Sequence, residues 1–362
     1  MASRKVIESI NKLREDILSG KLPQGQLLPT EKQLAQSLKL SRPTVAKIYD
    51  ALSQEGLIRK KAGFGTIVVY GEESKPLNFG LLFPGAGESE IFGAISDQFL
   101  QIEKEDNIKF LWEGTIANDA KIRQSTILKT CQTYVDNDVD GVFFVPLERV
   151  VKSASINRDV CEMLDQHNIP VVLLDRDIDN FPIRSKYPVI GLDNFRAGYL
   201  TAKHIIEQGC KKIYFLYRKD SPSSVYKRIA GCSKACFDEG IDFTKENLIS
   251  GNPSQSDFLG KVKIVAGETG ILCANDTTAA ALMANISNLG YEVTKDILVA
   301  GFDDLKYAEM LRFPLTTYKQ PIEDIVSTSL QTMQNQLENK NTISMNLDLK
   351  GELIIRQSTT FS

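Results

Sequence analysis

Histidine is scarce in this sequence, and its cysteines lack the spacing of a metal site. The 362 residues include two histidines, His167 and His204, and six cysteines, none of which form a C-x-x-C pair. Because zinc ligands recur at such short spacings, the sequence predicts no metal site and no cofactor. The cysteines are best explained as reduced core residues, so we expect a cytoplasmic protein.

Long apolar runs and catalytic motifs are missing as well. No segment reaches the about 20 apolar residues of a membrane helix, and none follows the N-terminal charges as in a signal peptide. There is no G-x-S-x-G motif, and Gly85-Ala-Gly87 is no nucleotide loop because Glu90 replaces its third glycine. Asp303 and Asp304 are adjacent, so their carboxylates point apart and form no acid–base pair. We therefore expect neither an enzyme nor a membrane partner.

Charge is divided unevenly along the chain. Residues 1–70 hold 12 Lys and Arg against 6 Asp and Glu, a net charge of +6, although the whole chain carries only −3. The other 292 residues hold 31 basic and 40 acidic residues, a net charge of −9. A small basic head on an acidic body predicts a polyanionic partner for the head alone.

The head has the pattern of three helices and a hairpin. Apolar residues spaced by 4, 3 and 4 predict a first helix, Val6–Ile17. Thr30 begins a second helix, with Gln33 completing a capping box, and Ser41 caps a third that ends at Gly56. The following residues, Leu57-Ile58 and Thr66–Val69, alternate as short β segments do, which predicts a winged helix-turn-helix.

In such a unit the third helix enters the major groove of double-stranded DNA. Arg42 can bond guanine with two hydrogen bonds, and Thr44 can contact a thymine methyl group. Lysines suit phosphate contacts, and glycines at the wing tip let the backbone approach closely. The expected DNA-binding residues are Lys32, Ser41, Arg42, Pro43, Thr44, Lys47, Lys60, Lys61, Gly63, Phe64, Gly65 and Thr66.

These motifs resemble those of the GntR family of bacterial transcription regulators, over nearly all of residues 4–69. The matching segments are Leu28–Ala35, Leu40–Val45, Glu55–Ile58 and Gly63–Thr66. The family usually has arginine where Lys32 stands, so we expect Lys32 to contact phosphate instead of reading a base.

The acidic body alternates buried strands with helices, in two successive runs that divide at Val189. Near-continuous apolar strands joined by helices predict parallel sheets covered on both faces. The predicted fold is therefore an α+β winged helix-turn-helix head and an α/β two-lobed body with doubly wound parallel sheets. We place the head at residues 1–70, a polar linker at 71–77 and the effector-binding and dimerisation body at 78–362.

Polar side chains follow the predicted strands where ligands bind in such folds. Carboxylate, amide and guanidinium groups can bond neighbouring hydroxyls, and an aromatic ring can cover an apolar ring face. This combination favours a hydroxyl-rich ligand. Asp276, immediately before Thr277, is better explained as the cap of the next helix, whereas Asn275 suits either role.

The body resembles the sugar-responsive domain of LacI/GalR regulators, which is similar to periplasmic sugar-binding proteins, over about residues 78–336. The matching segments are Asp140–Val142, Ile169–Arg176, Val189–Asn194, Ala202–Ile205, Arg228–Gly231, Ala274–Asp276, Gly301–Asp304 and Leu315–Pro321. The resemblance implies that Arg228, Asn275 and Asp303 hold ligand hydroxyls. It also places Arg176 at the first crossing between lobes, Gln320 at the last, and Phe92 at the aromatic wall. Glu90 adds an acid near the mouth, and Asp193 follows a strand, which completes the expected ligand site.

Three functions are compatible with these patterns. The first is a dimeric repressor whose affinity for operator DNA is controlled by a small sugar. The second is the same regulator with a purine, nucleoside or other metabolite as effector. The third, an enzyme fused to a DNA-binding head, ranks last because no activated nucleophile or metal site is visible.

Overall fold

The structure is a computed structural model, and the chain divides into two compact units, Met1–Lys75 and Pro76–Ser362. It describes residues 4–61, 65–70, 76–83, 90–103, 107–112, 120–148, 150, 152–179, 181–219, 221–252, 262–338 and 344–361. Gly63 and Phe64 of the predicted wing, residues 71–75 of the predicted linker and the Gly85–Gly87 loop lie outside the described residues.

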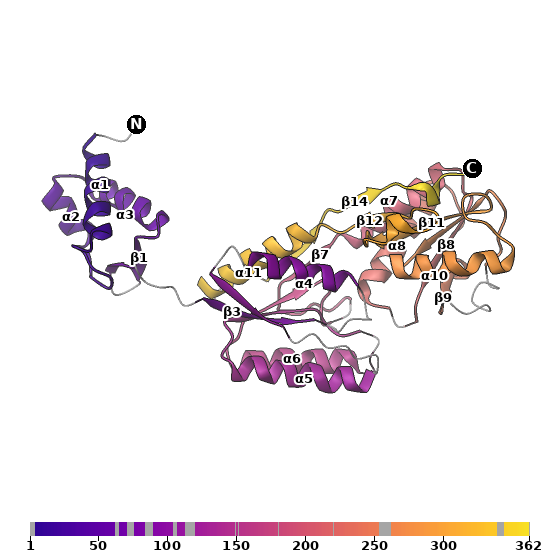
Figure 1. The fold of residues 1–362 in the computed structure, drawn as a ribbon, viewed down its shortest axis with the longest axis horizontal. Coiled ribbons are helices and arrows are strands. Elements are labelled where there is room, and N and C mark those ends of the chain that lie inside the picture. Colours follow the sequence, from indigo (N-terminus) through magenta and orange to yellow (C-terminus); the bar gives the residue numbers. More distant parts are fainter. Residues whose placement is uncertain are drawn as a thin grey trace. The chain divides into compact units, whose positions relative to one another are not determined.

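The first unit is the expected three-helix domain with a hairpin (Figure 1). Its elements are α1 (Arg4–Leu18), α2 (Glu31–Leu38), α3 (Arg42–Gln54), β1 (Ile58–Lys61) and β2 (Gly65–Val68). The strands pair antiparallel, with Ile58 opposite Val68. One core joins all three helices and the hairpin, because Ile17, Val45, Tyr49 and Val68 are fully or almost fully buried in a single cluster.

Local hydrogen bonds fix where these helices begin. The predicted capping box of α2 is confirmed, since the Thr30 hydroxyl accepts from the Gln33 amide and the Gln33 side chain accepts from the Thr30 amide. The Ser41 hydroxyl likewise accepts from the Thr44 amide at the start of α3. Between the helices, Lys39 adopts a left-handed φ of 52° and ends α2.

Within its described ranges, the second unit contains two six-stranded sheets, one in each lobe. The first sheet has the order β13 (Asn346–Leu349), β7 (Val189–Leu192), β6 (Val171–Leu174), β5 (Gly141–Phe144), β3 (Leu77–Leu82), β4 (Ile108–Leu111). The second has the order β14 (Glu352–Ile354), β12 (Thr316–Lys319), β11 (Ile297–Asp303), β10 (Thr269–Cys273), β8 (Lys212–Tyr217), β9 (Leu248–Ser250). Neighbouring strands run parallel except β12 and β14, so the predicted doubly wound sheets are confirmed.

Helices cover both faces of the first sheet (Figure 1). Helices α4 (Ile91–Ile102) and α11 (Ile322–Glu338) lie on one face, and α5 (Ala120–Asp136) and α6 (Ser153–Gln166) lie on the other. Strand β5 is buried throughout because alternate side chains enter the two cores: Phe143 packs with α4, and Phe144 packs with α5 and α6.

The second sheet is enclosed in the same way by α7 (Asn194–Glu207) and α8 (Ser223–Asp238) on one face and α10 (Asp276–Ile286) on the other. Four 3₁₀ turns complete the described structure: Lys245–Asn247, Ser287–Leu289, Ala308–Met310 and Gln357–Thr359. None of the helices in the described ranges is long and apolar enough to cross a membrane.

Helices α7 and α8 approach until their backbones touch. A Cβ atom at Gly198 would overlap the carbonyl of Arg228, and one at Gly231 would overlap the carbonyl of Phe195. Both helices therefore need glycine at the crossing. The close approach also fixes the position of Arg228, one of the predicted ligand residues, on α8.

The predicted division between the lobes is wrong at Val189. Strand β7 belongs to the first sheet, where Val189 pairs with Leu173 of β6. The chain first crosses after β7, near Asp193 and not at Arg176, because parallel pairing with β6 holds β7 in the first lobe. Gln320 lies at the second crossing, not the last, since the chain crosses again between β13 and β14.

Candidate functional site

The first turn of α3 presents most of the residues predicted to read DNA. Ser41, Arg42 and Pro43 are exposed, Thr44 is half-buried, and Lys47 is exposed one turn further along. The Ser41 and Thr44 hydroxyl oxygens lie 2.7 Å apart, so both also serve the helix cap. The Arg42 side chain is 73% exposed and extends to within 3.3 Å of Glu31 on α2.

Glu31 connects Arg42 to a second predicted contact, Lys60 of the hairpin. Its other carboxylate oxygen lies 3.4 Å from Lys60 Nζ, which also donates to Asp50 at 2.9 Å. These hydrogen bonds, with that to Asp50 first, raise the pKa of Lys60. Exposed ion pairs of this kind contribute about 0–1 kcal/mol, so DNA phosphate can replace Glu31 at little cost.

The remaining predicted DNA contacts are distributed between surface and core. Lys32 is exposed on α2, and Gly65 is exposed with a φ of 103°. Lys61 ends β1. Thr66 is 8% exposed, and its carbonyl accepts from the Leu28 amide, so the structure gives it a structural role in the hairpin.

A polar cavity of about 60 Å³ lies between the two lobes of the second unit. The ends of strands in both sheets converge there, as doubly wound sheets require. Six of the eight predicted ligand residues line it: Phe92, Arg176, Arg228, Asn275, Asp303 and Gln320.

The other two predicted ligand residues are placed differently. Glu90 is exposed immediately before α4. Asp193 caps α7, since its carboxylate accepts from the Arg196 amide at 2.9 Å. Neither is among the described residues that line the cavity.

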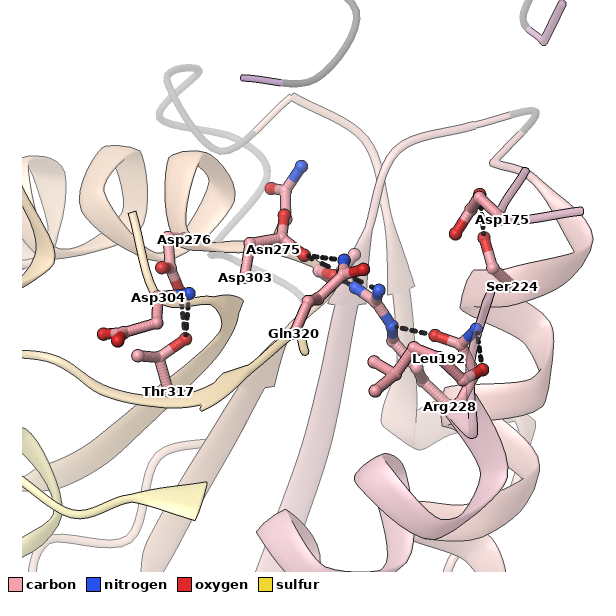
Figure 2. A network of polar contacts seen from close by, with 12 residues as sticks. Asp175, Leu192, Ser224, Arg228, Asn275, Asp276, Asp303, Asp304, Thr317 and Gln320 are labelled. Atoms are coloured by element: carbon pink, nitrogen blue, oxygen red, sulfur yellow. Dashed lines mark hydrogen bonds and ion pairs between the residues drawn. The ribbon is translucent and has the colours of Figure 1, made fainter. Parts of the chain in front are cut away.

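Several polar contacts hold the Arg228 side chain in the cavity (Figure 2). Its Nε donates to the Asn194 side chain at 2.7 Å, and its Nη1 donates to the Ala274 carbonyl at 2.6 Å. The guanidinium also lies 4.7 Å from the centre of the Phe302 ring. The residue is 4% exposed, so its charge is removed from bulk water.

Asp303 balances that charge from the end of β11. Its carboxylate lies 3.6 Å from Arg228 Nη2 and accepts a 2.7 Å hydrogen bond from Gln320 (Figure 2). Asp303 has a φ of 111°, a strained conformation for a residue with a side chain. The network therefore joins β11, the segment after β12 and α8 at one point.

The first lobe contributes a second charged group. Arg176 is 6% exposed, pairs with Glu148 and lies 3.1 Å from Asp175. Its guanidinium carbon is 5.5 Å from the centre of the Phe92 ring. Sequence reasoning missed Glu148, although an acidic residue shortly after the buried strand β5 was a usable signal.

One side-chain hydrogen bond joins the lobes directly across this region. The Ser224 hydroxyl, at the start of α8, donates to the Asp175 carboxylate at 3.3 Å (Figure 2). Asp175 ends the first-lobe strand β6, so this contact links the two sides of the cavity. Movement of one lobe against the other must change this distance.

Comparison with known families agrees with this geometry. Residues 8–68 match the bacterial regulatory proteins of the gntR family, and residues 202–359 match the periplasmic binding protein-like domain. The chain joins a GntR-type helix-turn-helix domain to a periplasmic-binding-protein-like domain.

Curated relatives of this chain include transcriptional repressors. The arabinose metabolism transcriptional repressor of Geobacillus stearothermophilus is 25% identical over 95% of this chain and 94% of that protein. The repressor PurR of Vibrio vulnificus is 28% identical over 61% of this chain, and the match spans 64% of PurR.

Solved structures share the fold of the second unit of the chain. A LacI family regulator from Enterococcus faecium with bound ribose has a TM-score of 0.63 at 20% identity, covering 78% of this chain and 98% of that one. The regulator CelR in complex with cellobiose has a TM-score of 0.64 at 18% identity, covering 91% and 100%.

The structure corrects one expectation about helix α10. Its cap is Asn275, whose side-chain oxygen accepts from the Thr278 amide at 2.9 Å, and not Asp276. Asn275 is thus both the cap and a cavity residue. Asp276 lies inside the helix start, where its carboxylate accepts from the Leu305 amide and from Thr317.

Two carboxyl groups of this region are buried: Asp303 lines the cavity, and Asp276 lies outside its lining. Burial, and then the nearby Asp303, raises the pKa of Asp276 to about 8. Burial also raises the pKa of Asp303 to about 6, against the lowering effect of Arg228. Both carboxyl groups therefore hold protons in the folded protein at pH values where an unfolded chain would release them.

Asp276→Asn tests the pH dependence that this burial implies. A raised folded-state pKa means that stability is full below the ordinary value of 3.8 and is lost as pH rises towards about 8. Asparagine can accept from Leu305 and donate to Thr317 without a charge. We expect the free energy of unfolding to fall less steeply between pH 4 and about 8 in the variant than in the wild type, measured by urea denaturation.

The control is Asp97→Asn, which removes a carboxylate from the exposed side of α4. It should keep the wild-type pH slope. An Asp276→Asn variant with the same slope as the wild type would show that Asp276 is ionised in the folded protein.

Proposed function

We propose that this chain is a homodimeric, sequence-specific transcriptional repressor whose affinity for operator DNA is controlled by a small carbohydrate. The observation that carries the proposal is the convergence of Arg228, Asp303, Asn275 and Gln320 in one buried cavity beneath Phe92. The exposed first turn of α3 carries the residues proposed to read the operator DNA.

The chemistry of the cavity favours hydroxyl groups. Asp303 supplies carboxylate acceptors, Arg228 and Gln320 supply donors, and Phe92 supplies a ring face. Such groups can bond neighbouring hydroxyls while the ring covers C–H bonds. Ribose and cellobiose in the two solved structures, and the name of the arabinose repressor, support a carbohydrate for this chain too.

A purine or nucleoside is the second candidate effector, and the PurR relatives favour it. A purine base needs flat stacking partners and amide edges. Phe92 is the one aromatic side chain among the described residues that line the inner cavity, so it provides a single stacking face there. We therefore rank a carbohydrate first.

The proposed mechanism couples the cavity to the DNA-reading heads. Effector contacts from both lobes favour one arrangement of the lobes over others, and the response is limited by the difference in affinity. Two heads in a homodimer read the two halves of a palindromic operator. The effector is bound and released unchanged, and no reaction is catalysed.

Arg42→Ala tests the DNA half of the proposal. Losing a bidentate arginine–guanine contact costs about 1–3 kcal/mol, or about 5- to 150-fold in affinity for the correct site. We expect the variant to lose most of its preference for a duplex selected from a random library over a scrambled duplex, measured by fluorescence anisotropy. Lys12→Ala, which removes an exposed charge from α1, is the control and should keep that preference. An Arg42→Ala protein that still discriminates would exclude Arg42 as a base reader.

Arg228→Lys tests the part of the proposal that concerns effector binding. Lysine keeps a positive charge near Asp303 but cannot reproduce the bonds to Asn194 and Ala274 with the same geometry. We expect effector affinity to fall at least about tenfold, with unchanged affinity for DNA, so that effector no longer alters DNA binding. Arg312→Lys, at a surface arginine that is 76% exposed, is the control. Normal effector binding by a folded Arg228→Lys protein would show that the cavity is assigned wrongly.

A further inference from the structure

A large groove adjoins the inner cavity on its outer side. Its volume is about 900 Å³, against about 60 Å³ for the cavity itself. Glu148, Arg176, Ser221 and Pro222 line both, so the two spaces share a wall and a junction. Because the groove takes lining residues from both lobes, anything bound in it contacts both lobes at once.

The volumes decide how much of a ligand each space can hold. Ligand sites in proteins usually measure about 300–1,000 Å³. The inner cavity is far below that range, whereas the groove lies within it. The cavity can therefore take the hydroxyl-bearing end of an effector, and the groove has room for its remaining part.

Two exposed aromatic side chains line the groove from opposite lobes. Phe181, after β6, is 93% exposed, and Tyr226, on the first turn of α8, is 50% exposed. Both rings are therefore accessible to a ligand in the groove. Polar groups, among them Asp177 and Lys227, lie in the same lining. Ring faces next to polar groups suit a sugar ring, which is apolar on its faces and polar at its edge.

We propose that the effector is a disaccharide or larger glycoside, with its terminal ring at the inner cavity and a further ring in the groove against Tyr226 and Phe181. This inference rests on the proposed function, because it extends the same carbohydrate site. It specifies a disaccharide or larger glycoside, whereas the groups of the inner cavity alone would accept any small carbohydrate.

Helix α8 connects the two halves of this extended site. Arg228, inside the cavity, and Tyr226, in the groove, are two residues apart on the same helix. The close packing of α7 at Gly198 and Gly231 holds that helix in place. A two-ring ligand thus contacts one rigid element at both of its rings, and the second ring adds contacts to the first lobe through Phe181.

The test compares each free sugar with a disaccharide built from it, using the full chain. We would titrate glucose, galactose and xylose, and cellobiose, maltose, lactose and xylobiose, by calorimetry. At least one disaccharide should bind more tightly than its component sugars. Tyr226→Ala and Phe181→Ala should weaken that disaccharide about 3- to 10-fold each and leave the monosaccharides unchanged. Phe237→Ala removes an aromatic ring that is 78% exposed on the same helix but outside the groove, and should change neither.

The outcomes separate this inference from the proposed function. If a free sugar binds as tightly as every disaccharide and the groove variants change nothing, the extended site is refuted while the carbohydrate regulator stands. If no carbohydrate binds but a nucleoside does, and Tyr226→Ala weakens it, the groove holds a base and both the sugar class and this inference fail. Circular dichroism of each variant confirms that a loss of binding is not a loss of fold.

Discussion

The buried charge of Arg228 is the constraint on which the candidate effector site depends. A guanidinium that is 4% exposed must be compensated, because an unpaired buried charge costs several kcal/mol. The chain compensates it with Asn194 at the start of α7, the carbonyl of Ala274 after β10 and the carboxylate of Asp303 at the end of β11. The bonds to Arg228 therefore hold three segments of the second lobe together. These segments form part of the wall of the cavity.

Several other features follow from this requirement. Helix α8 must present Arg228 at the right depth, which the glycine contacts with α7 make possible. Gln320 bonds Asp303 from a segment that crosses between the lobes, so the charge network reaches the hinge region. In the first lobe, the buried charge of Arg176 is compensated in the same way, by the carboxylates of Glu148 and Asp175. An effector placed between two such satisfied networks meets groups that are already oriented, which lowers the ordering cost of binding.

Features set by residues close together in the sequence could be predicted, and features set by contacts between distant segments could not. The helix starts at Thr30 and Ser41 were predictable because a cap is formed within three residues. The strands β5, β6 and β10 were predictable because they are continuously apolar and buried on both faces. The place of β7 was not, because its partner is chosen by pairing with β6 and not by its own residues. Strands β13 and β14 were missed because they are short and only partly buried, so they lack a continuous apolar pattern.

Six of the residues that line the cavity were predicted from their places at strand ends and from the family resemblance, but their roles were harder to assign. Asn275 and Asp276 are neighbours that could each have capped α10. Only the structure shows that Asp276 is needed instead by the Leu305 amide and Thr317. The position of Glu148 shortly after β5 was a usable signal, but its pairing with Arg176, 28 residues away, is visible only in the structure.

The central claim is that one chain binds DNA and a small carbohydrate and that the two events are coupled. The most direct test titrates the carbohydrate that binds most tightly into the protein alone and into the protein saturated with its operator duplex. Thermodynamic linkage requires the ratio of the two dissociation constants to equal the factor by which that carbohydrate changes operator affinity. We predict equal factors that differ clearly from one. Tight carbohydrate binding that is the same with and without operator would contradict the account.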